Sequence, residues 1–215
     1  MQSIKNIIFD FGGVIYDIDY FKSVEEFNKL GAIDFEAMYS QANQVKLFEK
    51  LEIGELTNAE FRKELKLSLD PNTSTIEIDN AWNALLIGFK KSRLDLLKRL
   101  SENYNIYLLS NSNTIHYKVF LEEFQTITNL KSFDELFIKA HFSFDIKLRK
   151  PDRAAYQYVV DKHQLNPAES LFIDDSIQNI EPAQSLGLKT YFLKKGEDLM
   201  DLFSENQLRA NLKID

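Results

Sequence analysis

Short runs of apolar residues that end abruptly at polar side chains recur along this chain. The runs cover residues 6–9, 106–109 and 171–173. Continuous apolar runs of this length indicate strands that are buried on both faces, as in a parallel sheet. Apolar residues recur at helical spacing in residues 93–100, 152–165 and 178–186. One more strand-like run covers residues 189–193. Strands that alternate with helices predict an α/β fold with a parallel sheet.

Residues 17–91 show a different pattern, which contains no convincing strand. We expect one helix that is opened by Ser23 and stops at Gly31, and a second over residues 35–51 that is capped by Asp34. A third helix is opened by Thr57 and ends near Asp70, and a fourth covers residues 76–89. Ser23 and Thr57 are each followed three residues later by Glu, which is the spacing of a capping box. We therefore expect a helical cap domain at 17–91, inserted into a core domain formed by 1–16 and 92–215.

The composition narrows the class of protein. A chain of 215 residues suits one core with a modest insertion. With 26 basic and 33 acidic residues the net charge is −7, which disfavours non-specific binding to nucleic acid or to an anionic membrane. The absence of Cys excludes disulfides, thiol catalysis and Cys-ligated metals, and it fits a reducing cytosol. No targeting segment is visible, so we expect a soluble cytoplasmic protein, with a monomer as the default.

Polar residues at the ends of the predicted strands carry the candidate chemistry. They comprise three carboxylates, a hydroxyl, an amide and an ammonium group, from Asp10, Asp174, Asp175, Ser110, Asn111 and Lys150. Ligands of open α/β sheets bind at the carboxyl ends of the strands. Clustered carboxylates repel one another unless a cation lies among them, and oxygen ligands favour a hard ion such as Mg²⁺. A lysine, a hydroxyl and the backbone N–H groups around Gly12-Gly13 suit a phosphate, so the set indicates phosphoryl transfer.

Four motifs make the chain resemble the haloacid dehalogenase-like (HAD) hydrolases. They occur in the family order, at residues 7–14, 108–111, 149–152 and 172–176. The resemblance implies a Rossmann-like parallel sheet core with an inserted all-helical cap domain. Within the superfamily the chain is most similar to small sugar phosphatases of the glucose-1-phosphate phosphatase type. That subgroup implies an Mg²⁺-dependent phosphatase acting on a small phosphorylated metabolite, such as a sugar phosphate.

The resemblance also assigns a role to each motif residue. Asp10 would be the nucleophile and a metal ligand, and residue 12 would give the metal its backbone carbonyl. Ser110, Asn111 and Lys150 would bind the transferring phosphoryl group, and Lys150 would also neutralise Asp10. Asp175 would bind the metal directly, with Asp174 beside it as a ligand or through water.

Gly12 departs from the family pattern. Most phosphatases of the superfamily have a second Asp at this position, which protonates the leaving group and then activates water. Such proton transfer is worth about 10²–10⁴-fold in rate. Its loss would slow the enzyme without silencing it, or another residue supplies the proton. Asp17, Asp19 and His116 are the candidates in the sequence.

Other interpretations of the same residues stay open at this stage. Asp174-Asp175 could cap a helix, and Ser110-Asn111 could form only a cap and turn. A dehalogenase would use Asp10 to attack carbon and would need no metal, which leaves Asp174-Asp175 without a role. A third alternative is a catalytically weak HAD-fold binding protein, because Gly12 replaces the acid/base residue. The intact acidic cluster argues against it.

Overall fold

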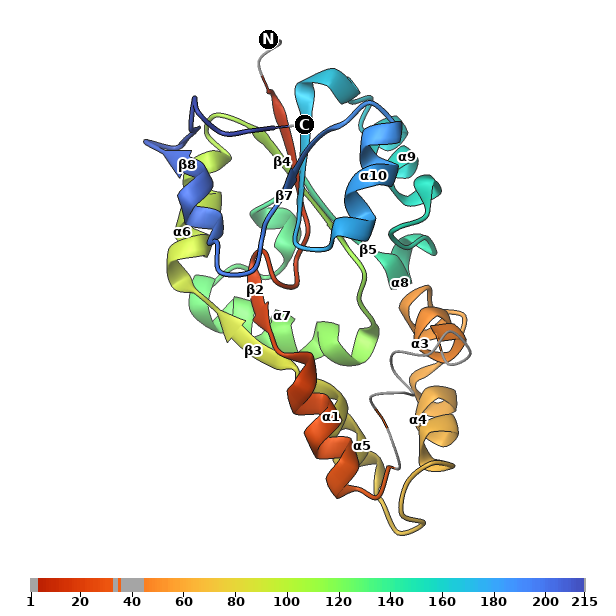
Figure 1. Cartoon of the computed structure of the whole chain (residues 1–215). Coiled ribbons are helices and arrows are strands. Elements are labelled where there is room, and N and C mark those ends of the chain that lie inside the picture. Colours follow the sequence, from red (N-terminus) through yellow and green to blue (C-terminus); the bar gives the residue numbers. More distant parts are fainter. Residues whose placement is uncertain (1–3, 33–34, 36–44, 215) are drawn as a thin grey trace.

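The core of the protein is a parallel five-stranded sheet. The computed structural model describes residues 4–32, 35 and 45–214. The strand order is β5-β4-β1-β6-β7, with β1 Asn6–Phe9, β4 Asn105–Ser110, β5 Lys139–Phe142, β6 Ser170–Asp174 and β7 Lys189–Phe192. Of these strands, Figure 1 labels β4, β5 and β7. All four pairings are parallel. The predicted α/β fold is therefore confirmed, and β5 is an additional strand that the apolar pattern does not reveal.

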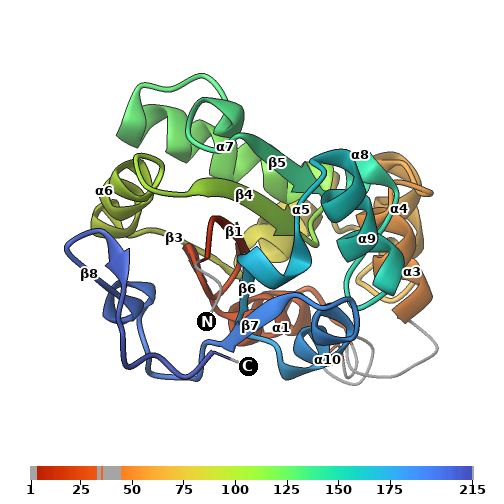
Figure 2. The ribbon, with the colours of Figure 1, turned by 90° about the horizontal axis from the view of Figure 1, so that it is seen from above.

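Helices cover both faces of this sheet. Figure 2 shows α6 Lys91–Leu100 and α7 Thr114–Thr128 on one side, and α9 Arg153–Lys162 and α10 Ile177–Ser185 on the other. Neighbouring residues of β1 pack in opposite directions: Ile7 and Phe9 join one buried cluster, whereas Ile8 joins the other. Burial on both faces explains why the strands are uniformly apolar. The shorter elements are η1 Phe133–Glu135, α8 Ser143–Ile146, η2 Pro167–Glu169, η3 Leu199–Leu202, β8 Phe203–Ser204 and β9 Gln207–Leu208.

The inserted helices lie beyond the carboxyl ends of the strands (Figure 1). They are α1 Tyr20–Lys29, α3 Val45–Glu52, α4 Asn58–Lys66 and α5 Thr75–Asn83. They enclose a hydrophobic cluster of their own, in which Phe27, Phe61 and Trp82 are buried. The Thr57 capping box forms as predicted, with Thr57 accepting from the Glu60 amide and Glu60 accepting from the Thr57 amide. The expected cap at Asp34 lies outside the described residues.

Two strands at the borders of the insertion correct the expectation of an exclusively helical segment. Strand β2, Tyr16–Ile18, pairs antiparallel with β3, Leu86–Phe89, so the helix expected over 76–89 is wrong beyond Asn83. Glu123 of α7 fixes this ribbon, because its carboxylate accepts from Tyr16 Oη at 2.8 Å and from the Phe89 amide at 3.0 Å. The two strands therefore carry the chain between the core and the inserted helices.

The first inserted helix also begins earlier than predicted. Asp19 is its N-cap and accepts from the Phe21 amide at 3.1 Å. Ser23 is buried, and its hydroxyl donates to the Trp82 carbonyl at 3.1 Å instead of capping a helix. Within the described residues, no helix combines the length and the apolar character that crossing a bilayer requires.

Candidate active site

Three carboxylates meet where β1 and β6 end. The two strands are neighbours in the sheet, and the Asp10 amide donates to the Ile173 carbonyl at 2.9 Å. Asp10, Asp174 and Asp175 each present an oxygen within 4.8 Å of the others, which is close enough to share one metal ion. The structure thus brings together all three acids that the sequence indicated.

Lys150 is buried between two of these carboxylates. Its side chain is 2% exposed, and Nζ donates to Asp10 Oδ1 at 2.6 Å and to Asp174 Oδ2 at 2.7 Å. Asn111 positions this lysine through its backbone: Asn111 Oδ1 accepts from the Lys150 amide at 2.8 Å, and Asn111 Nδ2 donates to the Lys150 carbonyl at 2.7 Å. Ser110, at the end of β4, is buried beside Asn111.

The two adjacent acids of β6 have different surroundings. Asp174 is fully buried, and besides Lys150 it accepts from the Ser176 amide at 2.8 Å and from Asn179 Nδ2 at 3.0 Å. Asp175 is exposed and lines a cavity together with Asp10. Asp174 therefore holds the lysine, whereas Asp175 faces the space where a ligand would lie. The sequence analysis missed Asn179, because nothing in a helix sequence marks which amide turns toward a strand end.

The electrostatics of the cluster are unbalanced. Burial raises the pKa of Asp10 to about 7, with Asp174 and Asp175 adding to the rise and Lys150 opposing it. Partial desolvation by the surrounding atoms of the site, together with Asp174, raises the pKa of Asp175 to about 6 although its side chain is exposed. Burial lowers the pKa of Lys150, but Asp10 and Asp174 outweigh it, so the net pKa of the lysine is raised. One ammonium group does not neutralise three carboxylates, and a divalent cation would supply the missing charge.

The loop after β1 must approach these acids closely. Gly13 has a φ of +79°, and a Cβ there would lie 2.0 Å from Asp175 Oδ2, so a side chain would displace the carboxylate. Gly12 is not among the residues with positive φ. A Cβ at Gly12 would come within 3.1 Å of Ile18 Cδ1, the end of a flexible side chain. Space for a larger residue at position 12 is therefore limited by Ile18.

A cavity of about 640 Å³ opens in front of the cluster. Core residues Asp10, Gly12, Lys150 and Asp175 form one wall. The inserted helices contribute the wall formed by Tyr20, Phe48, Glu49 and Glu52. A smaller cavity of about 70 Å³ also borders Gly12, and it shares Tyr20, Glu52 and Asn111 with the larger one. The site therefore lies between the core and the insertion.

The three candidates for the missing proton donor have other functions. Asp17 pairs with Arg93 Nη1 at 2.6 Å, Asp19 caps α1, and neither lines the two cavities. His116 lines the smaller cavity, but it is buried, stacks on Trp82 and lies 2.8 Å from Asn83 Oδ1 through Nδ1. Burial lowers the pKa of His116 to about 3, which makes the imidazole a poor base and keeps it neutral.

Glu52 is a cavity-lining acid that the sequence analysis did not select. It is the last residue of α3, and its side chain is 21% exposed. Arg149, which precedes Lys150, donates through Nε to Glu52 Oε2 at 3.0 Å and through Nη1 to Glu49 Oε1 at 2.8 Å. A glutamate at a helix end is usually solvated, so only the position of the insertion reveals that Glu52 reaches the site.

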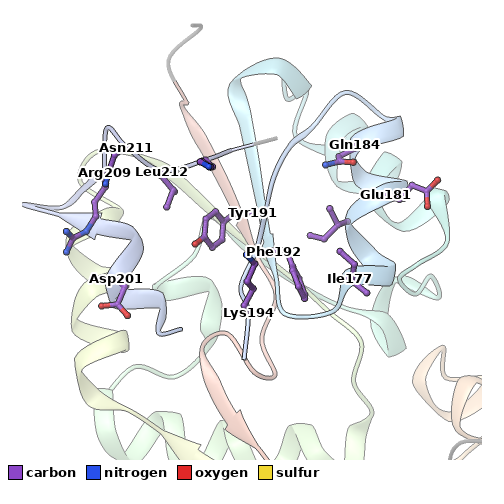
Figure 3. Close-up of a pocket in the computed structure, with 12 residues that line it drawn as sticks. Ile177, Glu181, Gln184, Tyr191, Phe192, Lys194, Asp201, Arg209, Asn211 and Leu212 are labelled. Atoms are coloured by element: carbon purple, nitrogen blue, oxygen red, sulfur yellow. The ribbon is translucent and has the colours of Figure 1, made fainter. Parts of the chain in front are cut away.

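A larger cavity, of about 950 Å³, lies elsewhere. Figure 3 shows it between α10 and the C-terminal segment, with Tyr191, Phe192 and Leu212 among the residues that line it. None of the four residues of the acidic cluster and its lysine contributes to it. Its size therefore gives no reason to move the candidate active site away from the carboxyl ends of β1 and β6.

The parallel α/β core carries acids and a lysine at its strand ends, and the inserted helices face them. This arrangement is typical of an enzyme that acts on an anionic group. The chain matches the family model for haloacid dehalogenase-like hydrolases over residues 4–187, and it belongs to that family. The predicted family and the predicted class of enzyme, a hydrolase, are thereby confirmed.

Known relatives cover almost the whole chain. It is 33% identical over 196 residues to the D-ribitol-5-phosphate phosphatase of Bacteroides thetaiotaomicron. The aligned residues cover 91% of this chain and 94% of that protein. A HAD family enzyme from the same organism, crystallised with magnesium and inorganic phosphate, aligns with a TM-score of 0.83 at 35% identity, over 94% of this chain and 100% of the other. A HAD-like hydrolase from Porphyromonas gingivalis gives a TM-score of 0.83 at 28% identity, over 93% and 96%.

Proposed function

We propose that this enzyme is an Mg²⁺-dependent phosphatase that hydrolyses the phosphomonoester of a small sugar or polyol through an aspartyl-phosphate on Asp10. One observation carries the proposal. A buried lysine joins Asp10 to Asp174 at one wall of a cavity of about 640 Å³, and Asp10 and Asp175 line that cavity. A carboxylate nucleophile, a lysine and a metal site at one point are parts that phosphoryl transfer uses.

The residues present fit the metal. Asp10, Asp175 and the Gly12 carbonyl would hold it, with Asp174 close by, and these oxygen donors suit a hard octahedral ion. Bound Mg²⁺ would stabilise negative charge on the phosphoryl oxygens. The fit agrees with the relative that was crystallised with magnesium and phosphate.

The protein groups divide the remaining work. Asp10 forms the new bond to phosphorus, and Lys150 orients its carboxylate through the 2.6 Å hydrogen bond and opposes the rise of its pKa. Ser110 and Asn111 stay candidate phosphoryl ligands. Because both polar atoms of the Asn111 side chain bond to the Lys150 backbone, we assign Asn111 first to positioning the lysine. Mutation of Asn111 should therefore affect the reaction through Lys150.

A polyol or sugar phosphate is the substrate class that the relatives favour, since the curated relative is a D-ribitol-5-phosphate phosphatase. The wall formed by Tyr20, Glu49, Glu52 and Arg149 is rich in hydrogen-bonding groups, which suits a hydroxylated leaving group. A dehalogenase is less well supported. The solved dehalogenases align with this chain at 17–19% identity and share the fold alone.

The test is a panel of phosphorylated sugars and polyols, with ribitol 5-phosphate included, and a 2-haloacid, each assayed with Mg²⁺ and with EDTA. We expect phosphate release that requires Mg²⁺ and is fastest with a member of the polyol or sugar phosphates. Release of halide, or phosphate release that is unchanged in EDTA, would contradict the proposal.

A further inference from the structure

We propose that Glu52 is the general acid and base of the phosphatase reaction, the role for which Gly12 has no side chain. This inference rests on the proposed function, because it supposes that Asp10 attacks a phosphomonoester.

The direction of attack determines where a proton is needed. In phosphoryl transfer the attacking and leaving oxygens lie roughly in line across the phosphorus atom. Asp10 attacks from the wall formed by the core, where Lys150 holds it. The leaving oxygen therefore points away from the strand ends and toward the inserted helices that lie beyond them (Figure 1), from which Tyr20, Phe48, Glu49 and Glu52 line the cavity.

Among the carboxylates that the inserted helices contribute to the cavity, Glu52 has the best position. Besides the larger cavity it lines the small cavity that borders Gly12, which Glu49 does not. Its side chain is also more buried, with 21% exposed against 34% for Glu49. Asp17 and Asp19 line neither cavity, and burial makes His116 a poor base. Glu52 therefore fits the role better than Glu49, because it lines both cavities and is more buried.

One oxygen of Glu52 is available for a substrate. Arg149 Nε occupies Oε2 at 3.0 Å, and the part of the chain described here offers no hydrogen-bond partner to Oε1. The charged groups around Glu52 are Arg149, Glu49 and Lys150. Burial raises the pKa of Glu52, and although Arg149 opposes it, the net pKa stays above the ordinary value. A raised pKa brings a carboxyl group closer to the range in which it both donates and accepts a proton near neutral pH.

The proton balance closes over two steps. When Asp10 forms its bond to phosphorus, the electron pair of the breaking P–O bond goes to the ester oxygen, and the proton of Glu52 passes to that oxygen to release the alcohol. Water then enters from the side that the alcohol has left. Glu52 takes one proton from this water while the water oxygen bonds to phosphorus. The bond between phosphorus and the Asp10 oxygen breaks, and its electron pair returns to the carboxylate of Asp10. Phosphate leaves, and Glu52 is protonated again.

The experiment compares Glu52→Gln with Glu49→Gln, because both variants remove one ion pair of Arg149 from the same helix. Wild type is first shown to hydrolyse an alkyl phosphate with Mg²⁺. Release of the alcohol in the first turnover is then measured by rapid quench for an alkyl phosphate and for 4-nitrophenyl phosphate. Unfolding temperatures show whether either substitution loosens the insertion.

We expect Glu52→Gln to slow the alkyl ester by about 10²–10⁴-fold and to slow the aryl ester far less, since a good leaving group needs no proton. In Glu52→Gln the decrease of kcat/KM at high pH should also disappear. Glu49→Gln should keep the wild-type ratio between the two esters and the wild-type pH profile. Equal losses on both esters, or a rise in KM alone, would overturn the assignment of Glu52. Failure of wild type to release phosphate from any ester would instead overturn the proposed function.

Discussion

Two buried cations of this protein each lie between two carboxylates, yet their surroundings differ. Lys150 lies between Asp10 and Asp174 at the site. Arg93, whose side chain is 4% exposed, bonds Asp17 through Nη1 at 2.6 Å and Asp198 through Nη2 at 2.8 Å. The second cluster connects α6 to the segment before η3 and to β2. Strand β2 is where the chain passes from the core into the insertion.

Asp198 of the Arg93 cluster and Asp10 of the Lys150 cluster have pKa values shifted in opposite directions. The hydrogen bonds of Arg93 hold the pKa of Asp198 below its ordinary value, with further help from the Met200 amide and Lys90. Burial instead raises the pKa of Asp10 to about 7, despite Lys150. The Arg93 cluster is neutralised by the protein itself and has a structural function. The Lys150 cluster has a third carboxylate and is completed only by an external cation, which is the property of a binding site.

The largest expected effect comes from removing the charge of Asp10. Asp10→Asn is nearly isosteric but cannot attack phosphorus, so turnover should fall by at least about 10⁴-fold. Because the substitution also removes a repelling charge, the unfolding temperature in EDTA should hold or rise. Phosphate release and thermal unfolding measure the two effects. An undiminished rate would show that Asp10 is not the nucleophile.

Metal binding should distinguish the two clusters next. Titration calorimetry should show one Mg²⁺ bound by wild type and a loss of affinity of at least about 10-fold in Asp175→Asn. Asp198→Asn, in the Arg93 cluster, should bind Mg²⁺ as wild type does. Equal binding by wild type and Asp175→Asn would remove Asp175 from the metal site.

The Arg93 cluster should matter for stability more than for rate. Arg93→Met leaves two carboxylates, Asp17 and Asp198, with only Lys90 as their shared partner. Because both are partly exposed, we expect the free energy of unfolding to fall by roughly 1–3 kcal/mol, below the cost of breaking a fully buried pair. Turnover at saturating Mg²⁺ should stay within a few-fold of wild type. A folded variant that has lost turnover would give this cluster a catalytic function.

The smallest expected effect is a pH dependence of stability without metal. The folded pKa of Asp10, about 7, lies above its ordinary value of 3.8, so the folded protein binds more protons between these pH values. Its stability therefore falls as pH rises from about 4 to about 7. The buried His116 changes stability in the opposite direction. The relevant quantity is therefore the difference between wild type and Asp10→Asn in EDTA, and a difference that does not vary with pH would contradict the raised pKa.

Much of the core could be predicted because its strands are buried on both faces. The apolar runs located β1, β4 and β6, and the residues that follow them meet at the site. Strand β5, Lys139–Phe142, has the sequence KAHF, which contains no apolar run. Strand β3 continues the apolar spacing of the helix before it, so its pairing with β2 is decided by tertiary contacts such as those of Glu123.

The parts of the site that depend on packing between distant segments could not be predicted. Asp10, Lys150, Asp174 and Asp175 follow strands or a recognisable motif, and their meeting follows from strand order. Glu52 reaches the cavity only because the insertion lies over the strand ends. Asp17 and Asp19 are close to Gly12 in sequence, but the ribbon of β2 and β3 and the start of α1 direct them to Arg93 and to a helix cap.

The central claim, a phosphoryl group carried by Asp10, is tested most directly by trapping it. Wild type is mixed with Mg²⁺ and 4-nitrophenyl phosphate, whose good leaving group favours accumulation of the intermediate, and quenched in acid within the first turnover. Mass spectrometry of the peptides then locates the added phosphoryl group. We predict that it is found on Asp10 and is absent from Asp10→Asn and from samples in EDTA. A phosphoryl group on any other residue, or Asp10→Asn turning over at the wild-type rate, would contradict the account.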